Sequence, residues 1–264
     1  MPEHAGRWPL SVLLLARDET SDLEELLPQL TFAAEIVVVW DPRGDQATRT
    51  CAERLGARVF EQAFVGFGPQ RRFALSQCTQ SWVLWIDADE RLDAAAVAAL
   101  GRAVQAPDAG PSHYRLQRAT WFLGRRIRFC GWQDELIVRL FRRAAARFDD
   151  AEVHEQVQVS GSGPGRLDGL LEHHSYRTYA DCTTKCVRYA RAGAIQAERR
   201  GRRAGALDVL VRPPLRFLRQ YVWQLGFLDG AHGLVLCGFA AVQVFLKYSQ
   251  LWRLSSGRAA DGSP

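Results

Sequence analysis

The sequence predicts an α/β protein whose first half is a mostly parallel central sheet with helices on both faces. Short apolar runs alternate with helical segments up to about residue 106. Acidic residues follow directly at the ends of these runs, where open α/β sheets bind ligands. From Asp181 onward the pattern is helical, so we expect a C-terminal helical extension.

The predicted strands of the first half are short runs of apolar and β-branched residues, as in strands covered on both faces. They cover residues 11–16, 35–40, 58–60 and 82–86. Thr20 or Ser21 is suited to cap the first helix, and Gly56 to end the second. The predicted helices cover residues 20–30, 46–55, 70–78 and 93–104.

The strand over 82–86 leads straight into acids, Asp87-Ala88-Asp89-Glu90. This spacing places the carboxylates of Asp87 and Asp89 near the carboxyl edge of the sheet. Two carboxylates this close repel each other unless a positive charge lies between them. A hard divalent cation that carries a phosphate ester would meet that need. The alternative is a solvated acidic turn that caps the next helix.

The chain beyond residue 107 is less regular, with strands expected over 113–116, 136–141 and 153–157. One helix is expected from Asp181 to about Arg203, and a break at Pro213-Pro214 before a second. The apolar run from Gly233 to Leu246, about 14 residues, is too short to span a bilayer. The basic, aromatic helices are therefore either an interfacial membrane anchor or core helices that pack on the sheet or on a partner subunit.

The composition is basic and dominated by arginine. The chain of 264 residues has 34 Lys and Arg and a net charge of +5, with lysine only at Lys185 and Lys247. Arginine binds phosphate and carboxylate through two parallel hydrogen bonds, which lysine cannot do. Such a surface suits nucleic acid, anionic lipid or phosphorylated substrates. Since no nucleic-acid recognition motif is present, we expect no nucleic-acid partner.

The motifs that are missing also exclude several classes. The six cysteines are scattered without a C-x-x-C pair, which argues against a zinc ribbon and for free thiols in a reducing compartment. No apolar signal segment is visible at the N-terminus. The first predicted strand ends in Arg17-Asp18-Glu19 rather than in a glycine-rich dinucleotide or phosphate loop. A sugar nucleotidyltransferase is disfavoured for the same reason.

Short motifs stand in a fixed order along residues 10–250. They are Leu13–Glu19, Glu35–Val39, Gly66–Leu75, Trp85–Glu90, Gly131–Asp134, Val138–Arg143, Val153–Glu155 and Gly226–Gly230. In order and spacing they resemble the family 2 glycosyltransferases with a GT-A fold, and most closely the bacterial enzymes that decorate the lipopolysaccharide core. We expect tails at 1–9 and 255–264, a GT-A domain over 10–180 and a helical extension over 181–254. Within the GT-A domain, residues 10–106 would be the nucleotide-sugar half and 107–180 the acceptor half.

The resemblance implies roles for individual residues. Asp87 and Asp89, together with His154, would bind Mn²⁺ or Mg²⁺. Asp134 would be the catalytic base, with Trp132 and Glu155 on the acceptor side. The residues expected to contact the nucleotide sugar are Arg17, Glu19, Asp41, Asp45, Gln70, Arg71, Asp87 and Arg139.

One turn departs from the family pattern. The family usually has an aspartate directly after the second strand, where this chain has Trp40, and Asp41 comes one position late. Asp45 keeps the second acidic place. The preference for the donor is therefore open. His173-His174 lacks metal-ligand spacing to another donor, so we expect it to be structural.

The expected activity is an inverting, metal-dependent transfer of a hexose from a nucleotide-diphosphate sugar, with a UDP-hexose as donor, to a lipopolysaccharide core or related glycolipid. The enzyme would be cytoplasmic and peripheral on the inner face of the cytoplasmic membrane, and a homo-oligomer is left open. One alternative keeps the fold and takes polyprenyl phosphate as acceptor. Another is a non-enzymatic, arginine-rich protein that binds anionic ligands.

Overall fold

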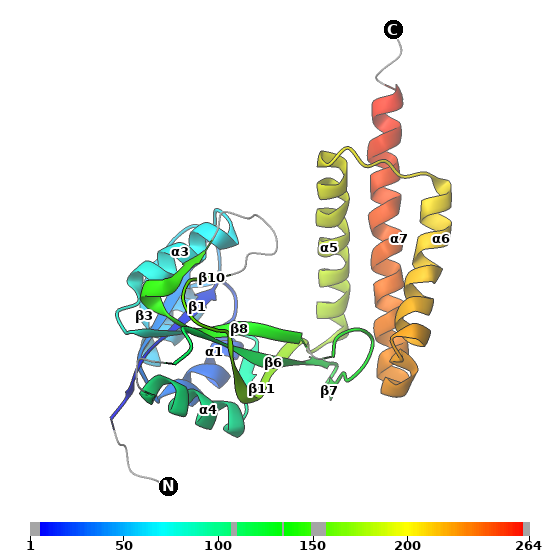
Figure 1. Cartoon of the computed structure of the whole chain (residues 1–264). Helices are drawn as coiled ribbons and strands as arrows, with labels where there is room; N and C mark the ends of the chain where they lie inside the picture. Colours follow the sequence, from blue (N-terminus) through cyan, green and yellow to red (C-terminus); the bar gives the residue numbers. More distant parts are fainter. Residues whose placement is uncertain (1–5, 107–109, 134, 149–156, 261–264) are drawn as a thin grey trace. The chain divides into compact units, whose positions relative to one another are not determined.

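The computed structural model describes residues 6–106, 110–133, 135–148 and 157–260 (Figure 1). The chain forms two compact units. The first comprises residues 1–118 and 135–173, and the second comprises 119–134 and 174–264. The second unit thus includes segments that precede residue 181, where the helical extension was expected to begin.

The first unit is built on a sheet that begins with parallel strands, as predicted. Their order is β3-β2-β1-β4, and every pair is parallel. Parallel neighbours need crossover connections, which the intervening helices provide. The strands are β1 (Trp8–Ala16), β2 (Ala33–Trp40), β3 (Arg58–Glu61) and β4 (Trp82–Trp85). Since β1 begins at Trp8, the tail expected over 1–9 is shorter than predicted.

Beyond β4 the sheet becomes antiparallel and continues as β8-β6-β11-β5. The sequence did not predict β5 or β11, which pair with each other. A short β7 pairs with the end of β6, and β9 and β10 form a separate sheet of two strands. These strands are β5 (Glu90–Leu92), β6 (His113–Phe122), β7 (Arg125–Arg126), β8 (Glu135–Arg142), β9 (Ala146–Phe148), β10 (Val157–Val159) and β11 (Gly165–Tyr176).

Helices cover both faces of the parallel strands. Val12 and Leu14 of β1 pack with α1, α2 and α4 on one face, while Leu13 packs with α3 and β9 on the other. This alternation explains why the predicted strands are apolar at nearly every position. The helices are α1 (Thr20–Leu26), continued by a 3₁₀ turn over Leu27–Leu30, then α2 (Gln46–Arg54), α3 (Phe67–Gln77) and α4 (Ala94–Gln105).

The second unit contains three long helices that lie side by side, with α7 between α5 and α6 (Figure 1). A capping box between Thr178 and Asp181 starts α5. A π-helical segment over Arg219–Trp223 and a 3₁₀ turn over Gly226–Asp229 connect α6 to α7. The helices are α5 (Tyr179–Arg199), α6 (Ala206–Leu218) and α7 (Gly230–Ala260).

Two predictions for these helices were wrong. Helix α6 runs through Pro213 and Pro214 instead of beginning after them; each proline removes one N–H donor, but its fixed φ is helical. Helix α7 has 31 residues and includes part of the expected tail. By length and composition alone, residues 226–256 form a helix that could cross a membrane, with 22% of its apolar window buried. The apolar run of about 14 residues is therefore much shorter than the helix that contains it.

Candidate active site

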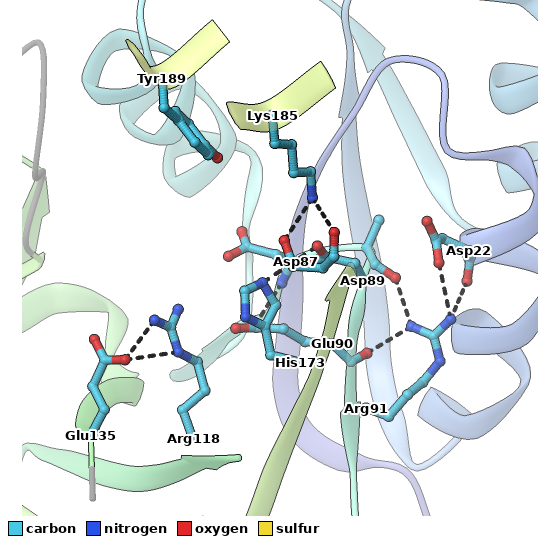
Figure 2. A network of polar contacts seen from close by, with 12 residues as sticks. Asp22, Asp87, Asp89, Glu90, Arg91, Arg118, Glu135, His173, Lys185 and Tyr189 are labelled. Atoms are coloured by element: carbon cyan, nitrogen blue, oxygen red, sulfur yellow. Dashed lines mark hydrogen bonds and ion pairs between the residues drawn. The ribbon is translucent and has the colours of Figure 1, made fainter. Parts of the chain in front are cut away.

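The turn Asp87–Glu90 is fixed at the carboxyl end of β4 by bonds to its backbone (Figure 2). The Asp87 N–H donates to Glu90 Oε2 at 3.0 Å, and the Glu90 N–H donates to the Asp87 carbonyl at 3.0 Å. Arg91 is buried and donates to the Ala88 carbonyl at 2.6 Å. Its other end reaches Glu25 of α1 at 2.9 Å. The turn is therefore held rigidly against the sheet and α1.

A buried arginine compensates the acids of this turn. Arg139 of β8 donates to Glu90 Oε1 at 2.5 Å and to Asp87 Oδ2 at 3.0 Å. Glu90 is fully buried, and burial raises its pKa while the Arg139 guanidinium opposes that rise. The Trp85 ring lies between two guanidiniums, 4.2 Å from Arg71 and 4.4 Å from Arg139. Trp85 also donates from Nε1 to Asp87 Oδ1 at 3.2 Å.

A cavity of about 510 Å³ opens beside Asp87. Its lining includes four arginines, and Asp87 is the acidic residue among the lining side chains that the structure describes. Arg118 also pairs with Glu135 at 2.6 Å (Figure 2). Such a cavity favours a ligand with negative charge. The lining residues are Arg71, Trp85, Asp87, Arg115, Arg118, Leu136, Ile137, Val138, Arg139 and Val157.

Asp89 lies beside a histidine that the sequence analysis took as structural. His173 Nε2 is 3.4 Å from Asp89 Oδ2 (Figure 2), because the antiparallel pairing of β11 with β5 brings His173 opposite Glu90. The side chains of Asp87 and Asp89 are 37% and 27% exposed. Carboxylate oxygens such as those of Asp87 and Asp89 suit Mn²⁺ or Mg²⁺. Within the described ranges no group of three or more His, Cys, Asp or Glu side chains could hold a metal ion, so these two carboxylates would supply only part of a complete donor set.

The acidic side chains of the turn after β2 form hydrogen bonds and an ion pair with neighbouring residues of the protein. Asp41 is buried and accepts from both Nε and Nη2 of Arg43, at 3.0 and 2.8 Å. This guanidinium lowers the pKa of Asp41 to about 2. Asp45 caps α2 by accepting from the Thr48 N–H at 2.6 Å, and Trp40 Nε1 donates to the Asp45 carbonyl at 3.2 Å.

The loop after β1 packs on this turn. The Asp45 N–H donates to Asp18 Oδ1 at 2.8 Å. Gly44 lies so close to Arg17 that a Cβ there would be 2.2 Å from the Arg17 carbonyl oxygen. Glu19 accepts from the N–H groups of Arg17 and Asp18, and burial raises the pKa of Glu19 despite these bonds. The two loops therefore form one braced edge next to the acidic turn of β4.

Of the remaining predicted residues, Gln70 and Trp132 are described by the structure and three others are not. Gln70 is buried and donates to the Gln62 carbonyl at 2.8 Å. Trp132 belongs to the second unit, where its ring stacks on Tyr176 at 5.8 Å. Asp134, His154 and Glu155 lie outside the described residues.

Sequence reasoning missed four residues around the acidic turn. Glu90 was part of a quoted motif, but its burial and its pairing with Arg139 depend on strand pairing. Arg115 and Arg118 stand three positions apart on β6, and no local pattern marks them as cavity residues. His173 is placed only by β11, which the sequence did not predict. The single available signal was the arginine-rich composition.

The sheet has the mostly parallel half, the acidic turn and the arginine-lined cavity at the end of its fourth strand that the GT-A class of fold predicts. Residues 16–159, more than half of the chain, match the family described as Glycosyl transferase family 2. The chain therefore belongs to glycosyl transferase family 2.

Several proteins are similar to this chain. A lipopolysaccharide core biosynthesis glycosyltransferase, LpsC, from Rhizobium meliloti is 27% identical over 91% of this chain and 93% of its own length. An uncharacterized glycosyltransferase from Rickettsia bellii is 32% identical over 31% of this chain and 28% of its own length.

Two solved structures overlap with part of the chain. Glucosyl-3-phosphoglycerate synthase from Mycobacterium tuberculosis is 20% identical over 53% of this chain and 58% of its own length, with a TM-score of 0.38. A mycobacterial protein shares 19% identity over 72% of this chain and 76% of its own, with a TM-score of 0.40.

Proposed function

We propose that this glycosyltransferase moves a hexose from a nucleotide-diphosphate sugar to a glycolipid of the lipopolysaccharide core type, with inversion at the anomeric carbon. The observation that carries the proposal is the cavity at the end of β4 that is lined by Asp87 and four arginines. Similarity to LpsC over nearly the whole chain supports the acceptor class.

The leaving group of this reaction is a nucleoside diphosphate, and its charge must be neutralised. We assign Asp87 and Asp89 as candidate donors for Mn²⁺ or Mg²⁺, with His154 as a further candidate outside the described residues. The metal, when bound, would act as a Lewis acid on the diphosphate. Arg71 and Arg139, which flank Trp85, add fixed positive charge on the cavity side of the turn.

The acceptor hydroxyl must lose its proton as it attacks, and we assign this step to the Asp134 carboxylate as general base. A single base, with no carboxylate nucleophile assigned, is consistent with inversion. The braced loops with Glu19, Asp41 and Asp45 would shape the nucleoside side. The cavity arginines Arg115 and Arg118 would meet a charged group on either substrate.

Calorimetric titration of UDP with and without Mn²⁺, followed by a donor screen that measures nucleotide release, tests this function. We expect UDP to bind with Mn²⁺ and one UDP-hexose to be turned over. Metal-independent or absent binding would favour a non-enzymatic anion-binding protein. Asp134→Asn separates the acceptors: a large loss of turnover supports a sugar hydroxyl, whereas little loss supports polyprenyl phosphate, which needs no strong base.

We also propose that α6 and the segment after it bind the inner face of the cytoplasmic membrane. Five apolar residues at helical spacing form an exposed stripe, from Leu207, which is 76% exposed, to Val222. Trp223 beside it is 77% exposed. The stripe consists of Leu207, Val211, Leu215, Leu218 and Val222. Arg212, Arg216 and Arg219 follow it one position away, as in helices that lie on anionic bilayers.

Co-sedimentation with vesicles of phosphatidylglycerol and phosphatidylethanolamine tests this surface. Leu207→Asp with Leu215→Asp should abolish sedimentation, whereas Val65→Asp, at a site 71% exposed in the first unit, should not. Equal binding of both variants would overturn the assignment. Loss of a dimer in analytical ultracentrifugation, with no effect on vesicles, would assign the stripe to a second copy of the chain.

A further inference from the structure

The four arginines that line the cavity of the first unit come from two places in its sheet. Arg71 and Arg139 flank the Trp85 ring at the end of β4, at 4.2 and 4.4 Å. Arg115 and Arg118 belong to β6, which pairs with β8 and is separated by it from β4. Adjacent strands lie about 4.8 Å apart, so β6 lies about 10 Å from β4 across the sheet. The cavity therefore has a second pair of guanidiniums away from the acidic turn.

The strand order indicates which substrate this second pair meets. The strands run in the order β2-β1-β4-β8-β6. The loops after β1 and β2, which would shape the nucleoside side, lie on one side of β4, and β8 and β6 lie on the other. A nucleotide sugar whose diphosphate is bound at the turn after β4 would place its sugar, and the acceptor that attacks it, towards β6. Because the proposed donor transfers a neutral hexose, the charged group that β6 meets belongs to the acceptor.

Arg118 is oriented by a partner on the neighbouring strand. It lies opposite Glu135 in the pairing of β6 with β8. Its Nε and Nη2 both donate to Glu135 Oε2, at 3.1 and 2.6 Å (Figure 2). This ion pair leaves Nη1 outside it, and the Arg118 side chain is still 26% exposed. A guanidinium that is already oriented loses less conformational freedom when it binds an anion.

Arg115 adds a positive charge that this ion pair does not neutralise. It is exposed and lies opposite Val138 in the same strand pairing. Within the part of the chain that the structure describes, no carboxylate forms an ion pair with it. Asp87, which lines the same cavity, is already bonded to Arg139. Arginine binds the oxygens of a phosphate or a carboxylate through two parallel hydrogen bonds, so the β6 end of the cavity favours such a group.

We propose that Arg115 and Arg118 form a subsite for an anionic group of the acceptor, a phosphate ester or a carboxylate on the attacked sugar or on its neighbour. This inference rests on the proposed function, because the position of the donor defines which end of the cavity the acceptor occupies. The subsite would bind the acceptor without touching the leaving diphosphate. It would therefore select glycans that carry the anion, since a neutral glycan leaves both guanidiniums unpaired.

The test measures how Arg115→Met changes the use of three forms of lipopolysaccharide core oligosaccharide: untreated, dephosphorylated, and with its carboxyl groups reduced to alcohols. The donor is the one found in the screen. Arg115→Met should raise the acceptor KM for the untreated form roughly tenfold to a hundredfold, the range for one lost hydrogen-bonded charge, and leave UDP–Mn²⁺ affinity unchanged. The treatment that removes the bound anion should raise the wild-type KM similarly and add little in Arg115→Met. Which treatment does so distinguishes phosphate from carboxylate.

Three further variants serve as controls for charge and folding. Arg102→Met removes an arginine of the same unit that is 68% exposed and does not line the cavity, so its acceptor KM should stay at the wild-type value. Arg115→Lys keeps the charge but not the two parallel hydrogen bonds, so its KM should lie between those of the wild type and Arg115→Met. Arg118→Met should raise the acceptor KM as Arg115→Met does. Circular dichroism checks that each variant is folded.

The outcomes separate this inference from the proposed function. A wild-type acceptor KM in Arg115→Met, a raised KM for the donor instead, or equal use of all three oligosaccharides by the wild type would remove the subsite and keep the transferase. If no donor is turned over, the proposed function fails, and calorimetric titration of the same oligosaccharides still decides the inference. Affinity that falls both in Arg115→Met and after one treatment supports the anion subsite, whereas absent binding or equal affinity in the variant overturns it.

Discussion

Two acidic turns follow parallel strands of the same sheet, and they use their carboxylates differently. After β2, Asp41 is buried against Arg43 and Asp45 caps α2. After β4, Asp87 lines a cavity and both Asp87 and Asp89 are partly exposed. In the first turn the charge is balanced by a neighbour two positions away. In the second it is balanced by Arg139 from β8, far along the chain.

The difference teaches that an acid at a strand end is a weak functional signal by itself. A carboxylate whose cation comes from its own turn is satisfied within the fold. Asp87 shares the buried guanidinium of Arg139, which is far away in the sequence, with Glu90. Its carboxylate is therefore held in place while part of it stays exposed, which suits a site that must accept a ligand. The next four predictions test this contrast.

The largest effect is expected at Asp89. Asp89→Asn should lower turnover on the order of 10²–10³-fold, because it removes a carboxylate ligand of the cation that is proposed to neutralise the leaving diphosphate, and should weaken the Mn²⁺ dependence of UDP binding. The measurements are kcat and calorimetric titration. Asp168→Asn, at a side chain 87% exposed, is the control. Unchanged turnover of Asp89→Asn would mean that the turn after β4 is structural, like the turn after β2.

Arg139→Met should destabilise the fold, because it leaves Glu90 buried without its cation. Removing one partner of a buried pair typically costs about 3–5 kcal/mol. Urea denaturation measures the change, and Arg139→Met with Glu90→Gln should recover part of it. If the single variant is as stable as the wild type, the pair does not hold the turn.

Asp45→Ala should cost about 1 kcal/mol through the lost helix cap and leave UDP affinity unchanged if the turn after β2 is structural. Thermal unfolding and UDP titration provide the two readouts. A tenfold loss of UDP affinity would instead assign Asp45 to the nucleoside, as the resemblance implied.

Arg43→Ala gives the smallest effect, and one that depends on pH. The folded pKa of Asp41 is lowered to about 2, below its ordinary value of 3.8. The stabilisation from this pair is therefore complete above about pH 4 and is lost as the pH falls through 2. Wild type and Arg43→Ala should differ in Tm by a few degrees at pH 7 and converge near pH 2. A difference that persists at pH 2 would mean that Arg43 stabilises the turn by other contacts.

Local patterns predicted the parallel half of the first unit because each strand is a continuous apolar run between helices. Strand β4 and its turn follow from residues 82–90 alone. Strands β5 and β11 could not be predicted in this way. Arg91 and Glu172 pair across them, and their charged residues resemble a loop in sequence until the partner strand is known. The contact of His173 with Asp89 could not be predicted for the same reason.

The helices of the second unit show a second limit. The prolines at 213 and 214 are a sound signal for a helix boundary in isolation, but α6 continues through both. Its exposed apolar stripe was visible in the spacing of Leu215, Leu218 and Val222. The spacing could not reveal that Gln220 and Asp229, in the segment after α6, form hydrogen bonds with the backbone of residues 128–130.

The division of the chain has a consequence for how such enzymes can diversify. The chain passes from one unit to the other three times, after residues 118, 134 and 173. The amides of Arg128 and Phe129 donate to Asp229, so the segment 119–134 depends on an acceptor that the C-terminal half supplies. A C-terminal half exchanged near residue 174 would have to bring an acceptor at this position to keep both hydrogen bonds.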